Sequence, residues 1–319
     1  MRTRKILAFL VLGIMLFLVS CKGKQVSSDK ITVYVSILPQ KFFVEKIAKG
    51  KVKVEVMVKP GHSPATYEPT PNQMAQLQQA KIYYRIGVPF EKLWIEKIKK
   101  SNTNLKIVDT REDIILQDMS ANILEVEHKE EHKHEKGHDH DKEEHKHEKG
   151  HDHKHDHSGK DPHIWLSPKL VKTQARNIQR ALTSLDPENK EFYRKNYYAF
   201  IKELDDLHEK LEKQLSKVKT KTIMVFHPAW GYFVKEFGFK QLPIEIQGKS
   251  PSPAELTKII TLAKKLKVKV IFVQKQFSTK EAEAVSKEIG AKVIQINPLA
   301  ENYIENLENI AHIFEKELN

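Results

Sequence analysis

The sequence predicts an α/β fold made of two lobes of the (β/α)4 type, each with a parallel sheet, joined by a long rigid α-helix. Apolar strand-like runs alternate with helix-like stretches in the first part of the chain, and the same alternation returns near its end. Such alternation is typical of parallel sheets whose faces are covered by helices. Between the two series, a helical region carries one continuous apolar stripe.

The first series begins at residue 31. Short apolar runs predict strands at residues 31–38, 51–58, 81–86 and 105–109. The stretches between them predict helices at residues 39–49, 72–80 and 90–100. Because a helix separates each pair of strands, we expect a parallel sheet.

The second series has the same order. Strands are predicted at residues 222–227, 242–246, 268–274 and 292–297. Helices are predicted at residues 229–237, 252–266, 279–289 and 303–318. The two lobes are therefore expected to be of similar size and architecture.

The region between the series predicts a helix over 168–184, a break at Asp186-Pro187, and a second helix over 188–217. Apolar side chains recur in the second helix at spacings of three and four residues: Phe192, Tyr193, Tyr197, Phe200, Leu204, Leu207, Leu211 and Leu215. At ~1.5 Å per residue, some thirty residues span about 45 Å, enough to run along both lobes. We therefore expect an N-terminal lobe at 31–187, a stiff linking helix at 188–217 that limits lobe closure, and a C-terminal lobe at 218–319.

The first residues have the pattern of an export signal. Basic residues precede an apolar run over 6–19, which ends in Leu18-Val19-Ser20-Cys21. The run is shorter than the roughly 20 residues needed to span a bilayer. This end resembles a bacterial lipobox, which implies a signal peptide at 1–20, a lipid on Cys21 and a tether at 21–30. The alternative is an ordinary signal followed by an unmodified thiol.

The composition argues against a disulfide-stabilised fold and against a nucleic-acid-binding protein. Cys21 is the only cysteine among 319 residues, so no intramolecular disulfide can form. The formal net charge is +12, but lysines lie beside glutamates along the predicted helices rather than in one block. A solvated surface with weak attraction to anionic lipid is expected.

The segment 128–157 differs from the rest of the chain, because it holds 11 His, 10 Asp or Glu, 7 Lys, 2 Gly and no apolar residue. It cannot contribute to a core, and it predicts a disordered loop that binds metal weakly. Its expected auxiliary ligands are His132, His134, His138, His140, His145, His147, His151, His153, His155 and His157.

Two stretches of this segment, 134–138 and 147–151, match the zinc-peptidase pattern H-E-x-x-H, and 128–132 matches its inverted form. Those motifs work on a helix with a buried back. Here glycine interrupts the two direct matches and no apolar residue anchors any of them. We interpret them as accidents of composition.

Three other histidines predict one metal site assembled by the fold. His163 follows the turn Asp161-Pro162 and precedes an apolar anchor, and His227 follows a buried strand. His62 also follows a strand, in a proline-rich loop. Ligands bind at the carboxyl ends of strands in open α/β sheets, so we expect all three to face a cleft between the lobes. For each histidine alone, a hydrogen-bonded structural role is the alternative.

Other polar residues near the predicted cleft could complete the coordination: Glu68, Gln247, Gln274 and Asn297. Such residues more often support ligands than bind metal. His208 and His312 lie within helical patterns and are assigned to solvent or ordinary hydrogen bonds.

The motifs together resemble the zinc- and manganese-binding solute-binding proteins of bacterial ABC importers, over essentially the whole chain after the signal. The resemblance is carried by the lipobox-like end of the signal, Pro60–Pro69, Asp161–Leu166, Phe226–Trp230 and Pro251-Ser252-Pro253. It implies two α/β lobes joined by a long helix, with the metal between them. Zinc members often insert a His-rich loop before the Asp-Pro-His motif, as here.

The chain departs from the family pattern at two positions. The family usually places its first ligand directly after the proline of the first motif, where this chain has Ala65, so His62 is the expected substitute. The late acidic ligand is replaced by Asn297. The fourth position is therefore assigned to Glu68, Asn297 or water.

The expected function is a monomeric, lipid-anchored receptor in the periplasm or on the outer surface of the cytoplasmic membrane. It would capture Zn²⁺ through His62, His163 and His227 and pass it to an ABC permease, with no enzymatic activity and no nucleic-acid partner. Imidazoles favour zinc over manganese, which prefers carboxylate oxygen. The alternatives are a manganese or iron receptor, a His-rich storage or adhesin lipoprotein, and a zinc hydrolase with Glu68 as its base.

Overall fold

The structure is a computed structural model that describes residues 30–119, 159–246, 248–277 and 279–319. The predicted signal peptide, Cys21, the His-rich segment 128–157 and Gln247 lie outside the described residues. Among the helices that are described, none has the length and apolar character needed to cross a bilayer.

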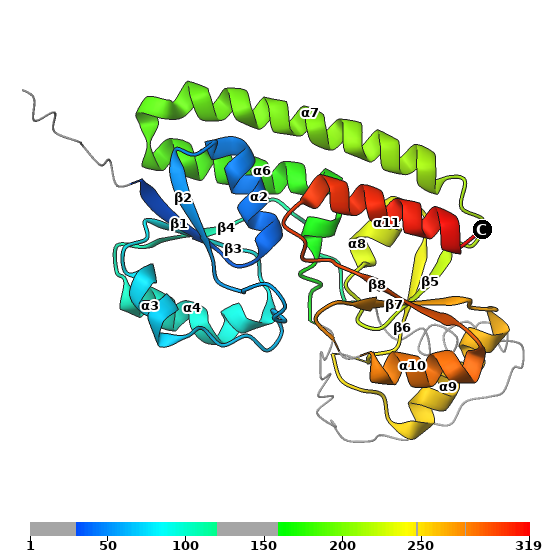
Figure 1. Cartoon of the computed structure of the whole chain (residues 1–319). Helices are drawn as coiled ribbons and strands as arrows, with labels where there is room; N and C mark the ends of the chain where they lie inside the picture. Colours follow the sequence, from blue (N-terminus) through cyan, green and yellow to red (C-terminus); the bar gives the residue numbers. More distant parts are fainter. Residues whose placement is uncertain (1–29, 120–158, 247, 278) are drawn as a thin grey trace, which may run out of the picture. The chain divides into compact units, whose positions relative to one another are not determined.

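The first lobe contains a parallel four-stranded sheet in the order β2-β1-β3-β4 (Figure 1). Its strands are β1 (Ile31–Val35), β2 (Val52–Val56), β3 (Ile82–Arg85) and β4 (Lys106–Asp109). The helices between them are α2 (Leu38–Ala48), α3 (Pro71–Leu77) and α4 (Pro89–Ser101). All seven elements lie where the sequence predicts them, because the central strands are apolar and buried and each helix begins with a proline in its first turn.

The second lobe repeats this arrangement in the order β6-β5-β7-β8, with every pair parallel. Its strands are β5 (Thr222–Val225), β6 (Lys240–Pro243), β7 (Val270–Gln274) and β8 (Lys292–Ile296). Its helices are α8 (Gly231–Glu236), α9 (Pro253–Lys265), α10 (Lys280–Ile289) and α11 (Tyr303–Glu317). The predicted pair of parallel α/β lobes is therefore confirmed.

One strand differs from its prediction. The sequence predicts a strand at 242–246, but β6 begins at Lys240 and ends at Pro243. Gln241 is buried inside it and accepts a hydrogen bond from the Trp230 backbone, so a polar residue occupies a core position. Beyond the strand, the Glu245 backbone N–H donates to the Phe226 carbonyl, which leaves the Glu245 side chain at the carboxyl edge of the sheet.

The linking region comprises the short helix η1 (Ile164–Leu166), α6 (Pro168–Leu185), η2 (Pro187–Asn189) and α7 (Lys190–Leu215). The long helix α7 packs against α6, against α2 of the first lobe and against α11 of the second (Figure 1). Its buried side chains include Tyr193, Phe200, Leu204, Leu207, Leu211 and Leu215. The apolar stripe of this helix is thus the surface that both lobes cover.

One hydrophobic core is continuous through both lobes, and a smaller one lies between the second sheet and the helices α9 and α10. Phe43 on α2 and Tyr303 on α11 meet edge to face, with 5.0 Å between ring centroids. Nearby, the Lys41 ammonium lies 2.5 Å from a Glu301 carboxylate oxygen. The contact between the lobes therefore combines apolar burial with a partly buried ion pair.

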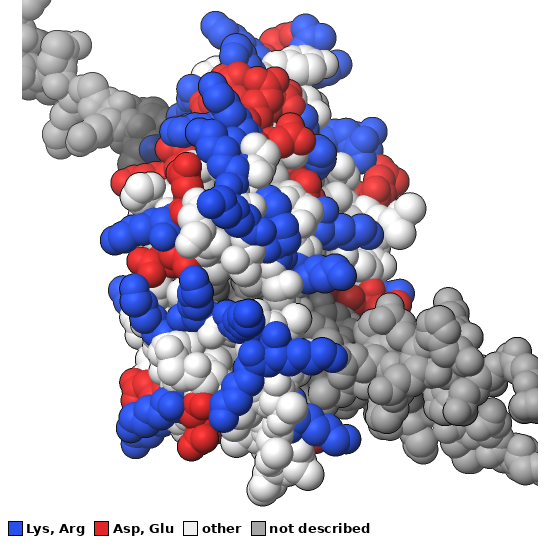
Figure 2. Space-filling model, turned by 90° about the vertical axis from the view of Figure 1, so that its right-hand side faces the viewer, with Lys and Arg blue, Asp and Glu red and all other residues white. Residues whose placement is uncertain are grey.

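Each of the eight strands begins with a lysine or directly follows one: Lys30, Lys51, Lys81, Lys106, Lys221, Lys240, Lys269 and Lys292. Seven of these strands follow the carboxyl end of a helix, where a cation is favoured by the helix dipole. On the face where α7 and α11 end, Lys and Arg are scattered, with Asp and Glu between them (Figure 2). These eight lysines thus lie at the amino ends of the strands, away from their carboxyl ends.

Candidate metal site

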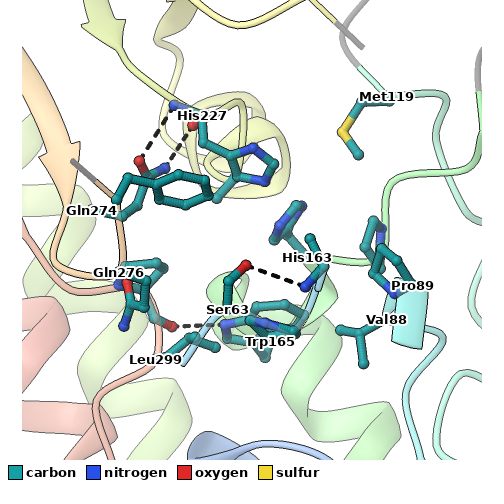
Figure 3. A pocket seen from close by; sticks show the side chains of 16 residues that line it. Ser63, Val88, Pro89, Met119, His163, Trp165, His227, Gln274, Gln276 and Leu299 are labelled. Atoms are coloured by element: carbon teal, nitrogen blue, oxygen red, sulfur yellow. Dashed lines mark hydrogen bonds between the residues drawn. The ribbon is translucent and has the colours of Figure 1, made fainter. Parts of the chain in front are cut away.

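A pocket lined mostly by apolar side chains lies between the lobes and contains two imidazoles (Figure 3). The first lobe and the linking region contribute Ser63, Pro64, Ala65, Val88, Pro89, Met119, Pro162, His163 and Trp165. The second lobe contributes His227, Ala229, Gln274, Gln276, Phe277, Pro298 and Leu299. An apolar wall strengthens the attraction between a bound cation and the few polar groups that reach it.

His163 is held by the aspartate that precedes it by two residues. The buried carboxylate oxygen Oδ1 of Asp161 accepts hydrogen bonds from the His163 backbone N–H, at 2.9 Å, and lies 2.7 Å from the His163 Nδ1. Trp165, whose indole N–H donates to the Pro298 carbonyl at 2.8 Å, packs against the His163 ring. With Nδ1 facing Asp161, Nε2 is the nitrogen left for the pocket.

His227 is held in the same way from the second lobe. Its Nδ1 lies 2.5 Å from Oε2 of Glu245, a buried residue just after β6. Gln274, at the end of β7, donates its amide N–H to the His227 carbonyl and accepts from the His227 N–H. Phe277 stacks on the ring. His227, Glu245 and Gln274 thus meet at the carboxyl ends of β5, β6 and β7, as expected for a ligand site in an open parallel sheet.

The environment keeps the imidazole of His163 neutral. Burial lowers its pKa and outweighs the opposing effect of Asp161, and the neighbouring His227 lowers it further. A neutral imidazole has the free electron pair that a metal needs. The pair of carboxylates behind the two rings supplies the negative charge that a bound dication favours.

Asp161 is itself held in place by a residue from each lobe. The Gln117 side-chain amide donates to its other oxygen, Oδ2, at 3.2 Å. The Tyr232 hydroxyl donates to the Asp161 carbonyl at 2.9 Å. Gly231 lies so close that an added Cβ would be 2.6 Å from Asp161 Oδ2. The absence of a side chain at Gly231 therefore permits α8 to approach the His163 segment.

His62 does not lie in this pocket. It is exposed, its ring meets the edge of Tyr67 at 5.6 Å, and its backbone N–H donates to the Lys59 carbonyl. It lines two adjoining hollows, one shared with Glu68 and the other with Gln276, Asn297 and Leu299. The structure therefore brings together two of the three predicted histidines, and Ala65 of the same loop faces the pocket instead.

The remaining candidates have other partners. The side-chain oxygen of Asn297 accepts from the Gln276 amide and from the Leu299 backbone N–H, each at 3.0 Å. Glu68 is exposed and lines a hollow separate from His163 and His227. Within the described part of the chain, no three His, Cys, Asp or Glu side chains are close enough to hold a metal ion together.

The roles of Glu245, Gln274 and Tyr232 were not evident from the sequence. Glu245 falls inside the predicted strand 242–246, so nothing marked its side chain as part of an edge. The sequence predicts Gln274 as a possible ligand, whereas its amide binds the main chain of His227. Glu245 and Gln274 become recognisable only once the ends of β6 and β7 are known, and Tyr232 only from its contacts across the lobe boundary.

Comparisons with known sequences place these features in context. The profile of a family described as ZnuA, zinc-uptake complex component A periplasmic, matches residues 33–316. The high-affinity zinc uptake system protein ZnuA of Bacillus subtilis is 34% identical over 285 residues, which cover 88% of this chain and 82% of that protein. The zinc-binding lipoprotein AdcA of Streptococcus pneumoniae strain R6 is 29% identical over 92% of this chain, which spans 57% of its length.

Solved structures of related proteins have the same fold as this chain. A crystal structure of ZnuA superposes with a TM-score of 0.77 at 36% identity, covering 91% of this chain and 100% of that one. A zinc-bound variant of AdcAII of Streptococcus pneumoniae gives a TM-score of 0.73 at 26% identity, with 91% and 99% covered.

Proposed function

The chain belongs to the family of the periplasmic component A of zinc-uptake complexes, and we propose on this premise that it captures Zn²⁺ outside the cytoplasm and delivers it to the permease of an ABC importer. The observation that carries the proposal is the pair His163 and His227, which face one pocket from two different parts of the chain. Imidazole nitrogen is a preferred zinc ligand. Two related proteins are named for zinc uptake or zinc binding, and the related AdcAII has a zinc-bound structure, which supports the same cargo.

His163 and His227 are the two ligands that the geometry supports best. Each ring turns its Nδ1 to a buried carboxylate, Asp161 or Glu245, so each Nε2 is free for the metal. A carboxylate behind a ligating histidine fixes the ring and raises its basicity. The neutral state of His163 means that the ion need not displace a proton at neutral pH.

His62 remains the proposed third ligand. One support is that His62 lines a hollow that shares Gln276 and Leu299 with the pocket. The other is the preceding Gly61, which has a left-handed φ of 84° and no atom within 4 Å of where a Cβ would lie. The loop is tied further on, where the Phe90 backbone N–H donates to the Pro64 carbonyl. Binding then requires residues 61–63 to turn toward the pocket. Glu68, Asn297 or water takes the fourth position.

The lipid on Cys21 and the auxiliary histidines of segment 128–157 belong to the same proposal. Their support is the sequence pattern and the name lipoprotein carried by the relative AdcA. A lipid would keep the receptor beside its permease, and the histidines would raise the local zinc concentration. No catalytic role is proposed, because the one candidate base, Glu68, lines a different hollow from the two imidazoles.

The proposal is tested by titrating zinc into the protein against a competing chelator. Wild type should bind one tight equivalent, and His163→Ala and His227→Ala should each weaken that equivalent by well over about tenfold, as expected for loss of a metal ligand. His312→Ala is the matched control, because His312 is exposed on α11. Several weak equivalents without a tight one would favour a storage lipoprotein. Tighter binding of Mn²⁺ than of Zn²⁺ would favour a manganese receptor.

A further inference from the structure

We infer that the Tyr232 hydroxyl is a positioning group for both imidazoles, because it joins the helix that follows His227 to the segment that carries His163. The inference rests on the proposed function, since it concerns the geometry of the same metal site. It concerns a side chain that does not line the pocket and that the comparisons do not single out.

The hydroxyl of Tyr232 is buried and makes two hydrogen bonds across the lobe boundary. It donates to the Asp161 carbonyl at 2.9 Å and accepts from the Gln117 backbone N–H at 3.1 Å. Burial raises the pKa of Tyr232 to about 12, so the hydroxyl keeps the proton that it donates. Both partners are main-chain groups. The hydroxyl therefore fixes the positions of the backbone at 117 and at 161 relative to α8.

Those two backbone positions set the carboxylate that orients His163. The Asp161 side chain accepts from the Gln117 amide through Oδ2, while its Oδ1 holds the His163 backbone and faces the ring Nδ1. A shift of Asp161 therefore turns the imidazole of His163. The Asp161 backbone N–H also donates to the Gln117 carbonyl at 2.9 Å, so the two backbone positions are joined directly.

On its other side, Tyr232 is tied to His227. Tyr232 is the second residue of α8, a helix that begins four residues after His227. The start of this helix is fixed by the Trp230 backbone N–H, which donates to the Gln241 side chain on β6. The hydroxyl thus relates His163 to the same rigid element that places His227.

Two further contacts fasten the same segments. The Ser167 hydroxyl, at the start of α6, donates to the Glu236 carboxylate at the end of α8. The Trp165 indole N–H donates to the Pro298 carbonyl of the second lobe. In Figure 1, η1 lies beside α8, in agreement with their residue contacts. These contacts hold the segment that carries His163 against the second lobe.

The test compares two tyrosines in the full chain. Tyr232→Phe removes the hydroxyl at the proposed position, and Tyr193→Phe removes another buried hydroxyl, which donates to Asp186 at 2.7 Å far along the chain from either imidazole. Zinc affinity is measured by chelator competition for the tightest equivalent, and Co²⁺ bound at the first equivalent is followed by its visible absorption. The unfolding temperature is measured for each variant.

Tyr232→Phe should lose roughly tenfold to a hundredfold in affinity, as for other groups that orient a ligand, and its Co²⁺ spectrum should change. Tyr193→Phe should lower the unfolding temperature without either effect. An affinity of Tyr232→Phe within twofold of wild type, or an equal loss in both variants, would overturn the inference. Failure of wild type itself to bind a tight equivalent would instead contradict the proposed function.

Discussion

The imidazole rings of His163 and His227 lie with 5.3 Å between their centroids and 71° between their planes. They come from opposite sides of the linking region, 64 residues apart in the chain by their numbers. Each ring is fixed by a buried acid on its far side, Asp161 for one and Glu245 for the other. The separation of the two free nitrogens is therefore determined by the fold before any metal arrives, which lowers the entropic cost of binding.

Removing the charge behind one ring should weaken binding without removing a ligand. In Glu245→Gln, the amide no longer supplies the negative charge that favours a dication, so zinc affinity should fall by roughly tenfold to a hundredfold. Glu288→Gln, an exposed change on α10, is the control. Chelator competition measures both variants, and equal affinities would show that Glu245 has only a structural role.

The loop that follows β2 and carries His62 and Ala65 allows an experiment in which zinc binding should become tighter. Ala65 lines the pocket with both imidazoles, whereas His62 does not, so Ala65→His should add a ligand and raise zinc affinity by about tenfold or more. The increase should persist in the double variant with His62→Ala. An unchanged affinity for His62→Ala alone would remove His62 from the ligand set.

The fold was predictable because its information is local. Strands β1, β3 and β7 are apolar runs bounded by turns, and α7 has a regular apolar stripe, so single segments reveal them. The sequence predicts β6 too far along the chain, at 242–246 instead of Lys240–Pro243. The reason is that the buried Gln241 takes a core position that sequence patterns assign to an apolar residue. Its hydrogen bond to the Trp230 backbone is a tertiary contact and leaves no periodic trace.

The candidate site was predictable only in part. His163 and His227 each follow a recognisable turn or strand end, and both reach the pocket. His62 also follows the carboxyl end of a strand. That position predicts the edge of the sheet at which a loop lies, but not the direction in which a side chain of the loop points. The side chain that lines the pocket three residues later belongs to Ala65, which has no ligating atom.

Acid should release the metal. Burial lowers the pKa of His163, against the opposing effect of Asp161, so this ring stays neutral below the ordinary imidazole value of about 6.5. Zinc affinity should therefore hold near pH 7 and fall steeply toward about pH 5, as protons compete for the imidazoles. A pH-corrected chelator assay measures this. A flat profile to pH 5 would point to carboxylate ligands and to manganese.

Deleting residues 128–157 should change the stoichiometry and leave the tight site intact. The segment has no apolar residue, so its removal should hardly alter the unfolding temperature of the metal-free protein. Zinc stoichiometry should drop to one, because the composition of this segment predicts only weak zinc sites, which would lose conformational entropy on binding an ion. Loss of the tight equivalent on deletion would mean that this segment supplies a ligand.

The approach of α8 to Asp161 can be tested through Gly231. An alanine there would place its Cβ 2.6 Å from Asp161 Oδ2 and 2.7 Å from the Gln117 amide nitrogen. The Gln117 amide is the end of a flexible side chain, but Asp161 Oδ2 cannot retreat freely, because Asp161 is buried and its Oδ1 holds His163.

The clash opposes the intrinsic preference of a helix for alanine over glycine, which is worth about 1 kcal/mol. Overpacking a fixed site costs roughly 1–3 kcal/mol, so we expect Gly231→Ala to lower the free energy of unfolding and to weaken zinc binding as Asp161 shifts. Gly159→Ala is the control, because an added Cβ there meets no atom within 4 Å. Urea denaturation and chelator competition measure the two effects, and a Gly231→Ala protein more stable than wild type would show that α8 yields to the added methyl group.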